Sequence, residues 1–239
     1  MKISTILIIA AVVATITALT AYNFTLRASY LKGDYKNPFY GMEFTPIKDL
    51  DAINISSANL VSVTIEQGVK EGIWVSDEAE KKISWSHHGN VLQIDLSKKS
   101  KDERDRVNGR SIIVVTNHLS QVNTKALFKT AEDEQSYSSG EVTIKGYKEG
   151  NLQLVMDRSS SVYLDNNNLQ SFKAIVGDAQ HGDSRLSMSK ENTIAAADFN
   201  VAGASEINLS GPKITKTNYT LSEKATVTLN GKALQSLLQ

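Results

Sequence analysis

Two patterns of apolar residues divide the chain. Residues 3–22, ISTILIIAAVVATITALTAY, carry no charge and are long enough for a helix across a bilayer core of roughly 30 Å, at about 1.5 Å per residue. From residue 50 onward, apolar and polar residues alternate with period two in short runs that Gly and Asn interrupt. Short alternating runs between turn residues are typical of β-strands. The pattern therefore predicts an all-β domain preceded by an N-terminal hydrophobic helix.

The apolar run fits two kinds of targeting segment. It is longer than the core of about 7–15 residues that a cleaved signal peptide usually has, which favours a retained signal-anchor. Cleavage after Ala21 would place Leu19 where a small residue is preferred, although removal of the segment stays open. We expect a signal-anchor or transmembrane helix over 1–24, a linker over 25–43, and an exported domain over 44–239.

The first half of the domain contains one break in the alternation. Residues 97–110, SKKSKDERDRVNGR, mix both signs of charge and contain Val107 as their one apolar residue. This composition predicts a solvated loop or a protruding hairpin tip. His87 and His88 precede Gly89–Asn90, and adjacent histidines on a strand point to opposite faces, so we expect an exposed pair and no metal site.

The last third repeats a unit of about twenty residues. Leu164, Met188, Leu209 and Leu229 end similar strands, at steps of 24, 21 and 20 residues, and a second strand follows each of the first three at a nearly fixed offset. Such units bury their apolar faces only when they stack on one another. We therefore predict a right-handed β-helix-like solenoid of short strands with about 20-residue rungs. An antiparallel sandwich or barrel is the alternative, although it gives no reason for the repeat.

The motifs also resemble a known family, the head GIN domain family of auto-transporter adhesins. The matching strands near the start are Leu50–Ile55, Val63–Gly68 (V-x-I-x-Q-G), Ile73–Val75 and Gly89–Ile94. The later segments SSVYLDN, GASEINLSG and KATVTLNG look like its rungs, so that the resemblance covers residues 44–235. The chain departs from the family at Asn117–His118, where a proline is usual, and in the charged run. The resemblance implies a bacterial envelope protein with a β-helix-like fold, shaped like pectin lyases, and an adhesion role.

Composition limits the possible chemistry. The chain has 239 residues, with 26 basic and 26 acidic side chains and no cysteine. Zero net charge argues against a nucleic-acid partner, because such a protein needs a basic surface to displace counterions. The absence of cysteine excludes disulfides, thiolate metal sites and a cysteine nucleophile. No phosphate loop, nucleophile elbow or zinc signature occurs, so we expect no cofactor, no metal and no catalytic residue.

One insertion in the repeat is the candidate binding site. Nine residues, GDAQHGDSR, separate Val176 from Leu186, whereas five residues join the corresponding strands of later units. Insertions in repeat proteins gather on one face and often form a binding surface. The alternative is a tolerated loop without a role, because an insertion at the surface costs little stability. The polar residues of this bulge are Asp178, Gln180, His181, Asp183 and Arg185.

Together these observations predict a non-enzymatic, adhesin-like envelope protein. Its partners would be the membrane, through the N-terminal helix, and an envelope glycan or protein. The alternatives are a polysaccharide-active enzyme of pectin-lyase-like shape and a membrane-tethered envelope sensor. Only two residues precede the apolar run, which leaves little chain for a cytoplasmic signal.

Overall fold

The computed structural model describes residues 3–33, 36–103, 105–128, 140–148, 150–178 and 183–231. The chain forms two compact units, Met1–Gly41 and Met42–Gln239. The first unit is built around helix α1 (Ile3–Lys32), which buries none of its side chains against protein. This helix is long and apolar enough to cross a membrane, and it fits a membrane anchor or a signal sequence.

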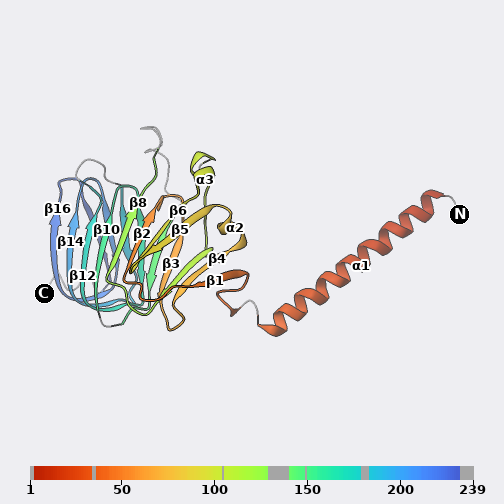
Figure 1. The fold of residues 1–239 in the computed structure, drawn as a ribbon, viewed down its shortest axis with the longest axis horizontal. Helices are drawn as coiled ribbons and strands as arrows, with labels where there is room; N and C mark the ends of the chain where they lie inside the picture. Colours follow the sequence, from red (N-terminus) through yellow and green to blue (C-terminus); the bar gives the residue numbers. More distant parts are fainter. Residues whose placement is uncertain are drawn as a thin grey trace. The chain divides into compact units, whose positions relative to one another are not determined.

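The second unit is built from two mixed β-sheets (Figure 1). The nine-stranded sheet has the order β1 (Met42–Pro46), β4 (Gly72–Ser76), β7 (Ile112–Thr116), β3 (Val63–Gln67), β9 (Val142–Lys145), β11 (Ser161–Asp165), β13 (Arg185–Met188), β15 (Glu206–Ser210), β17 (Thr226–Asn230). The eight-stranded sheet has the order β16 (Lys213–Leu221), β14 (Thr193–Val201), β12 (Asn168–Val176), β10 (Asn151–Met156), β8 (Gln121–Lys125), β2 (Ala52–Ser56), β6 (Val91–Leu96), β5 (Ile83–His88). The domain is all-β, as its alternating pattern predicts.

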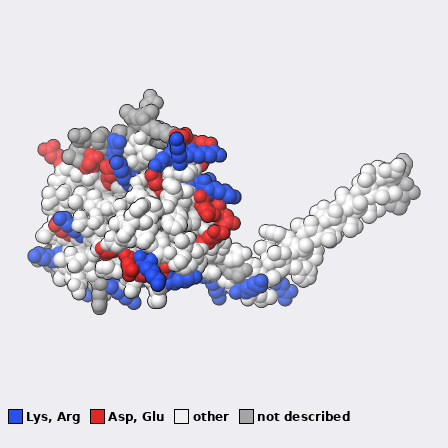
Figure 2. Space-filling model, viewed as in Figure 1, with Lys and Arg blue, Asp and Glu red and all other residues white. Residues whose placement is uncertain are grey.

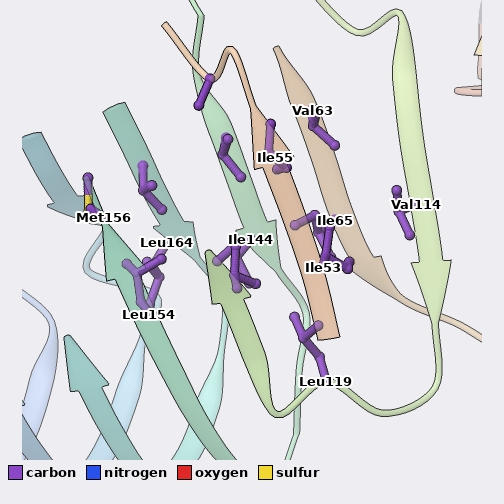
Figure 3. Close-up of a cluster of buried hydrophobic side chains, with 14 of the residues drawn as sticks. Ile53, Ile55, Val63, Ile65, Val114, Leu119, Ile144, Leu154, Met156 and Leu164 are labelled. Atoms are coloured by element: carbon purple, nitrogen blue, oxygen red, sulfur yellow. The ribbon is translucent and has the colours of Figure 1, made fainter. Parts of the chain in front are cut away.

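One hydrophobic core lies between the two sheets. Alternate residues of each strand point inward, so that Ile53 and Ile55 of β2 meet Ile65 of β3 and Ile144 of β9 (Figure 3). These side chains are at most 1% exposed. Complete burial of such a side chain stabilises the fold by about 1.5–3 kcal/mol, which explains why the alternation specifies the inward face of each strand so strongly.

The register predicted for the C-terminal repeat is confirmed. Leu164 pairs with Met188, Met188 with Leu209, and Leu209 with Leu229, all in parallel strands of the nine-stranded sheet. The second strand of each unit lies in the other sheet, where Ala174 pairs with Phe199 and Phe199 with Tyr219.

The prediction of a β-helix-like solenoid is nevertheless wrong. Strand β3 lies between β7 and β9, and β2 lies between β8 and β6, so strands distant in sequence are inserted beside one another. Strand β4 pairs antiparallel with β1 and β7, and β5 pairs antiparallel with β6. The prediction failed because period-two alternation fixes the face that a residue presents and leaves the neighbouring strand unspecified.

The prediction of a loop for residues 97–110 also needs correction. The segment contains helix α3 (Lys98–Glu103), whose first turn begins after Ser97, where the Ser97 hydroxyl accepts a bond from the Ser100 amide at 3.3 Å. The Lys101 ammonium pairs with the Asp95 carboxylate of β6, and Val107 is buried. A second short helix, α2 (Asp77–Glu80), follows β4.

Candidate functional site

The described residues of the predicted bulge lie at the ends of two strands that belong to different sheets. Asp178 follows β12 at the edge of a pocket on the eight-stranded sheet, whereas Arg185 belongs to β13 of the other sheet. The Arg185 guanidinium pairs with the Glu206 carboxylate at 3.3 Å. Asp183 is exposed and has a left-handed backbone, with φ of 76°. Gln180 and His181 lie outside the described residues.

The pocket beside Asp178 lies along a row of uncharged side chains. Outward residues of adjacent strands are in register across the eight-stranded sheet, and none of them carries a charge: Ser86, Gln93, Asn54, Asn123, Val155, Ile175, Asn200 and Thr220. Three neighbouring members of the row are amides, and the next two are aliphatic. Figure 2 shows a largely uncharged area in the middle of the visible face, with charged groups toward its margins.

Hydrogen bonds to neighbouring side chains hold the amide groups of the row in place. The Asn123 amide nitrogen donates to the Asn54 amide oxygen at 2.7 Å, and the Gln121 amide donates to the Asn123 oxygen at 2.9 Å. The Gln93 amide donates to the Ser56 hydroxyl at 2.8 Å. Each amide has two donor hydrogens and an acceptor oxygen, so these bonds fix the orientation and leave capacity for a ligand.

The resulting groove crosses five adjacent strands, β6, β2, β8, β10 and β12. Its volume is about 460 Å³. At about 4.8 Å between strands, the distance from the first strand to the fifth is about 19 Å. The residues that line it are Asn54, Ile55, Ser56, Gln93, Asn123, Thr124, Lys125, Val155, Met156, Asp157, Ile175, Gly177 and Asp178. This shape suits an extended ligand that lies across the strands.

Charged groups lie at the side of the groove where these strands end. Lys125 ends β8, Asp157 follows β10, and Asp178 follows β12. The Asp157 carboxylate accepts a bond from the Arg158 amide at 2.8 Å. Thr124 lines the same part, and its buried hydroxyl has no hydrogen-bond partner among the described groups. The groove therefore combines a neutral amide and aliphatic floor with a polar margin.

No group of three or more His, Asp or Glu side chains lies close enough for a shared ion among the described residues. His87 and His88 end strand β5, and both are exposed. His118 lies 3.4 Å from the Asp51 carboxylate, outside the groove lining.

The sequence prediction missed the amides that form the groove floor. Asn54, Gln93 and Asn123 come from three strands that are far apart in the chain and adjacent in the sheet. A signal was present, because each amide stands at an outward position between two inward residues, in Ile53–Ile55, Leu92–Ile94 and Val122–Thr124.

No family model and no curated protein sequence matches the chain. Solved structures do match. A Bacteroides fragilis protein described as a "putative adhesin" is 14% identical with a TM-score of 0.40, over 78% of this chain and 95% of that one. A "putative lipid binding protein" from Parabacteroides distasonis is 14% identical with a TM-score of 0.34, over 79% of this chain and 96% of that one. Neither likeness decides what this chain binds, and the head GIN resemblance rests on the sequence motifs.

Proposed function

We propose that this chain is a non-enzymatic, adhesin-like protein of the bacterial cell envelope. Its N-terminal helix anchors it in a membrane, and its groove on the eight-stranded sheet binds a neutral glycan. The envelope location is supported by the apolar helix Ile3–Lys32 and by the sequence motifs that resemble head GIN domains. The observation that carries the ligand class is the part of the uncharged row that lines the groove, which consists of Gln93, Asn54, Asn123, Val155 and Ile175 on five strands.

The chemistry of the row favours a glycan over a charged ligand. Amide groups both donate and accept hydrogen bonds, as sugar hydroxyls do. Val155 and Ile175 give the C–H face of a sugar ring an apolar surface at the end of the amide row. A charged ligand would meet no opposite charge in the middle of the groove.

The sheet topology also favours a glycan over an extended peptide. Peptides that bind sheets commonly add a strand to a free edge, where backbone groups are available. All five strands of the groove are internal to the sheet, so their backbone groups already pair with neighbouring strands. A ligand in the groove therefore meets the outward side chains of these strands and no free strand edge.

The test is a comparison of two matched substitutions in the full-length protein, reconstituted in nanodiscs and applied to a panel of neutral and acidic glycans. Asn123→Ala should weaken binding to a neutral glycan by about 2–10-fold, since one hydrogen bond worth about 0.5–1.5 kcal/mol is lost. Asn208→Ala removes an outward amide from the nine-stranded sheet and should leave binding unchanged. Equal effects of the two substitutions would reject the groove.

The same groove allows a direct test of the enzymatic alternative. Asp157 and Asp178 both line its charged end, and a pair of carboxylates is the usual machinery of glycoside hydrolysis. Non-enzymatic binding predicts that no glycan on the panel is consumed. Turnover that is abolished by Asp178→Asn would reject the proposed binding function in favour of a hydrolase or lyase.

A further inference from the structure

The turn between β3 and β4, residues 68–72, presents an unusually exposed apolar side chain. Val69 at its tip is 98% exposed. Among the described residues from Met42 onward, the other exposed large apolar side chain is Leu221, at 48%. A single exposed aliphatic side chain is common on a protein surface, so the meaning of Val69 depends on the residues that surround it.

Aromatic side chains fix the base of this turn. The Lys70 ammonium lies 4.1 Å from the centre of the Phe44 ring and 4.4 Å from that of Trp74. The two rings are 4.6 Å apart between their centres, on the adjacent strands β1 and β4. This arrangement places Lys70 over two aromatic faces beside Val69, and cation–π attraction holds it there.

Close packing at both ends of the turn requires glycine. A Cβ on Gly68 would lie 2.7 Å from the Val115 methyl group, and one on Gly72 would lie 2.3 Å from the Thr45 carbonyl oxygen. The turn is therefore packed directly against neighbouring strands, and its tip has a defined shape.

The one acidic residue of the turn is directed away from the tip. The Glu71 carboxylate accepts a hydrogen bond from the backbone N–H of Asn117 at 2.9 Å and another from the backbone N–H of Asp49 at 3.4 Å. The exposed part of the turn consequently presents Val69 and the Lys70 ammonium. Apolar, aromatic and cationic side chains are the types that proteins place at membrane–water interfaces.

Chain length limits how far β1 can extend from the end of helix α1. Residues 33–41 separate helix α1 from β1, and β1 carries Phe44. A fully extended chain from Lys32 to Phe44 reaches at most about 40 Å. A short tether gives an effective concentration on the order of millimolar, so even a weak contact with the same membrane would be occupied.

We propose that Val69 and Lys70 form a docking tip for an anionic lipid surface. Val69 enters the boundary between headgroups and acyl chains, and Lys70 meets the lipid phosphates. The inference rests on the anchored form of the protein proposed above. The docked domain would lie close to its own membrane, which restricts the directions from which a glycan reaches the groove.

The absence of cysteine makes a site-specific test clean. Val69→Cys and Ala204→Cys give single labelling sites, each carrying an environment-sensitive NBD group. Ala204 is the matched control, since it is exposed in the turn before β15, at the opposite end of the parallel strands from residues 68–72. Full-length protein is reconstituted into vesicles of phosphatidylcholine and phosphatidylglycerol in equal parts, with and without nitroxide-labelled lipid.

The label at position 69 should show emission at shorter wavelength and should be quenched by the nitroxide lipid, whereas the label at position 204 should show neither effect. Lys70→Gln should reduce the quenching at position 69, because an ammonium that meets lipid phosphates is removed. Water-like emission at position 69, in vesicles that carry the protein in a flotation assay, would reject the docking tip and leave the anchor intact. A shift to shorter wavelength without quenching would mean that a protein surface covers Val69, and would also overturn the proposal.

Discussion

At the scale of single residues, neighbours on one strand have opposite roles. Leu209 on β15 is 1% exposed in the core, while the side chain of the preceding Asn208 points outward and is half-buried. Leu209→Ala should lower the free energy of unfolding by about 2–5 kcal/mol, as core truncations do, and Asn208→Ala should change it by less than about 1 kcal/mol. Urea titration of both variants measures the difference. Equal losses would mean that the register of β15 is wrong.

Tyr147 is a buried tyrosine whose ionisation should be visible in the pH dependence of stability. Its side chain is 5% exposed, and its hydroxyl has no hydrogen-bond partner among the described groups. Burial, with smaller contributions from Glu66 and Glu71, raises the pKa of Tyr147 above its ordinary value. The neutral hydroxyl is therefore favoured in the folded state, and the unfolded chain releases this proton first as the pH rises.

The sign of the effect follows from that order of ionisation. Tyr147 makes its full contribution to stability below a pH of about 10, the pKa of tyrosine in the unfolded chain. Above that pH, the free energy of unfolding falls by up to about 1.4 kcal/mol per pH unit. Tyr147→Phe removes the ionisable group, so the variant should lose less stability than the parent between neutral and strongly alkaline pH. Urea titrations at several pH values measure this, with exposed Tyr40→Phe as the control. Parallel pH profiles for the parent and Tyr147→Phe would contradict the raised pKa.

At the scale of elements, a pair of asparagines joins successive turns of the C-terminal repeat. Asn167 and Asn192 are at most 1% exposed, and the Asn192 side-chain oxygen accepts bonds from the Asn167 backbone and side-chain nitrogens at 3.1 and 3.0 Å. The Asn192 nitrogen donates to the Leu164 carbonyl at 2.8 Å. The preceding Asn166 has a left-handed backbone, with φ of 52°, as expected for asparagine at a corner.

Removal of this amide should be costly although it lies in a turn. Asn192→Ala leaves the Asn167 backbone N–H buried without a partner, at about 1–3 kcal/mol. It also removes one bond each from the Asn167 side-chain nitrogen and the Leu164 carbonyl, which keep their bonds to Ile144 and Ser189. The exposed Asn200→Ala on β14 is the matched substitution and should stay within about 0.5 kcal/mol. Thermal unfolding of the two variants compares them. A small effect at Asn192 would show that water replaces the lost bonds.

The elements also show what the sequence could predict. The steps of 24, 21 and 20 residues predicted the pairing of Leu164, Met188, Leu209 and Leu229, because each inward residue stacks on the equivalent one. The insertion of β2 and β3 between later strands could not be predicted in this way. Their alternation specifies an inward face, and many neighbours would satisfy it equally well. The solenoid prediction extended a regularity of the C-terminal half to strands that do not share it.

At the scale of the whole molecule, the groove exists only through that strand order. Asn54 and Ile175 lie on one floor although they are far apart in the chain, because β2, β8, β10 and β12 are neighbours. Amides carry no spacing rule of the kind that identifies metal ligands or phosphate loops, so their convergence was invisible in the sequence. Asp178 lines the groove and belongs to the insertion after β12, which the sequence reveals because an insertion in a repeat is a local signal.

The anchored form itself can be tested at position 19. Leu19 occupies the place, third from the end of the potential signal segment, where a small residue is preferred, and Ala21 would be the last residue before cleavage. We expect the parent protein to keep its N-terminal segment and to remain in the membrane fraction after alkaline carbonate extraction. Leu19→Ala creates an Ala-x-Ala sequence, and a fraction of that variant should begin at Tyr22 and become soluble. Leu7→Ala makes the same change within the apolar run and should be retained like the parent. A soluble parent protein that begins near Tyr22 would show that the segment is a cleaved signal, and the groove would then operate on a released domain.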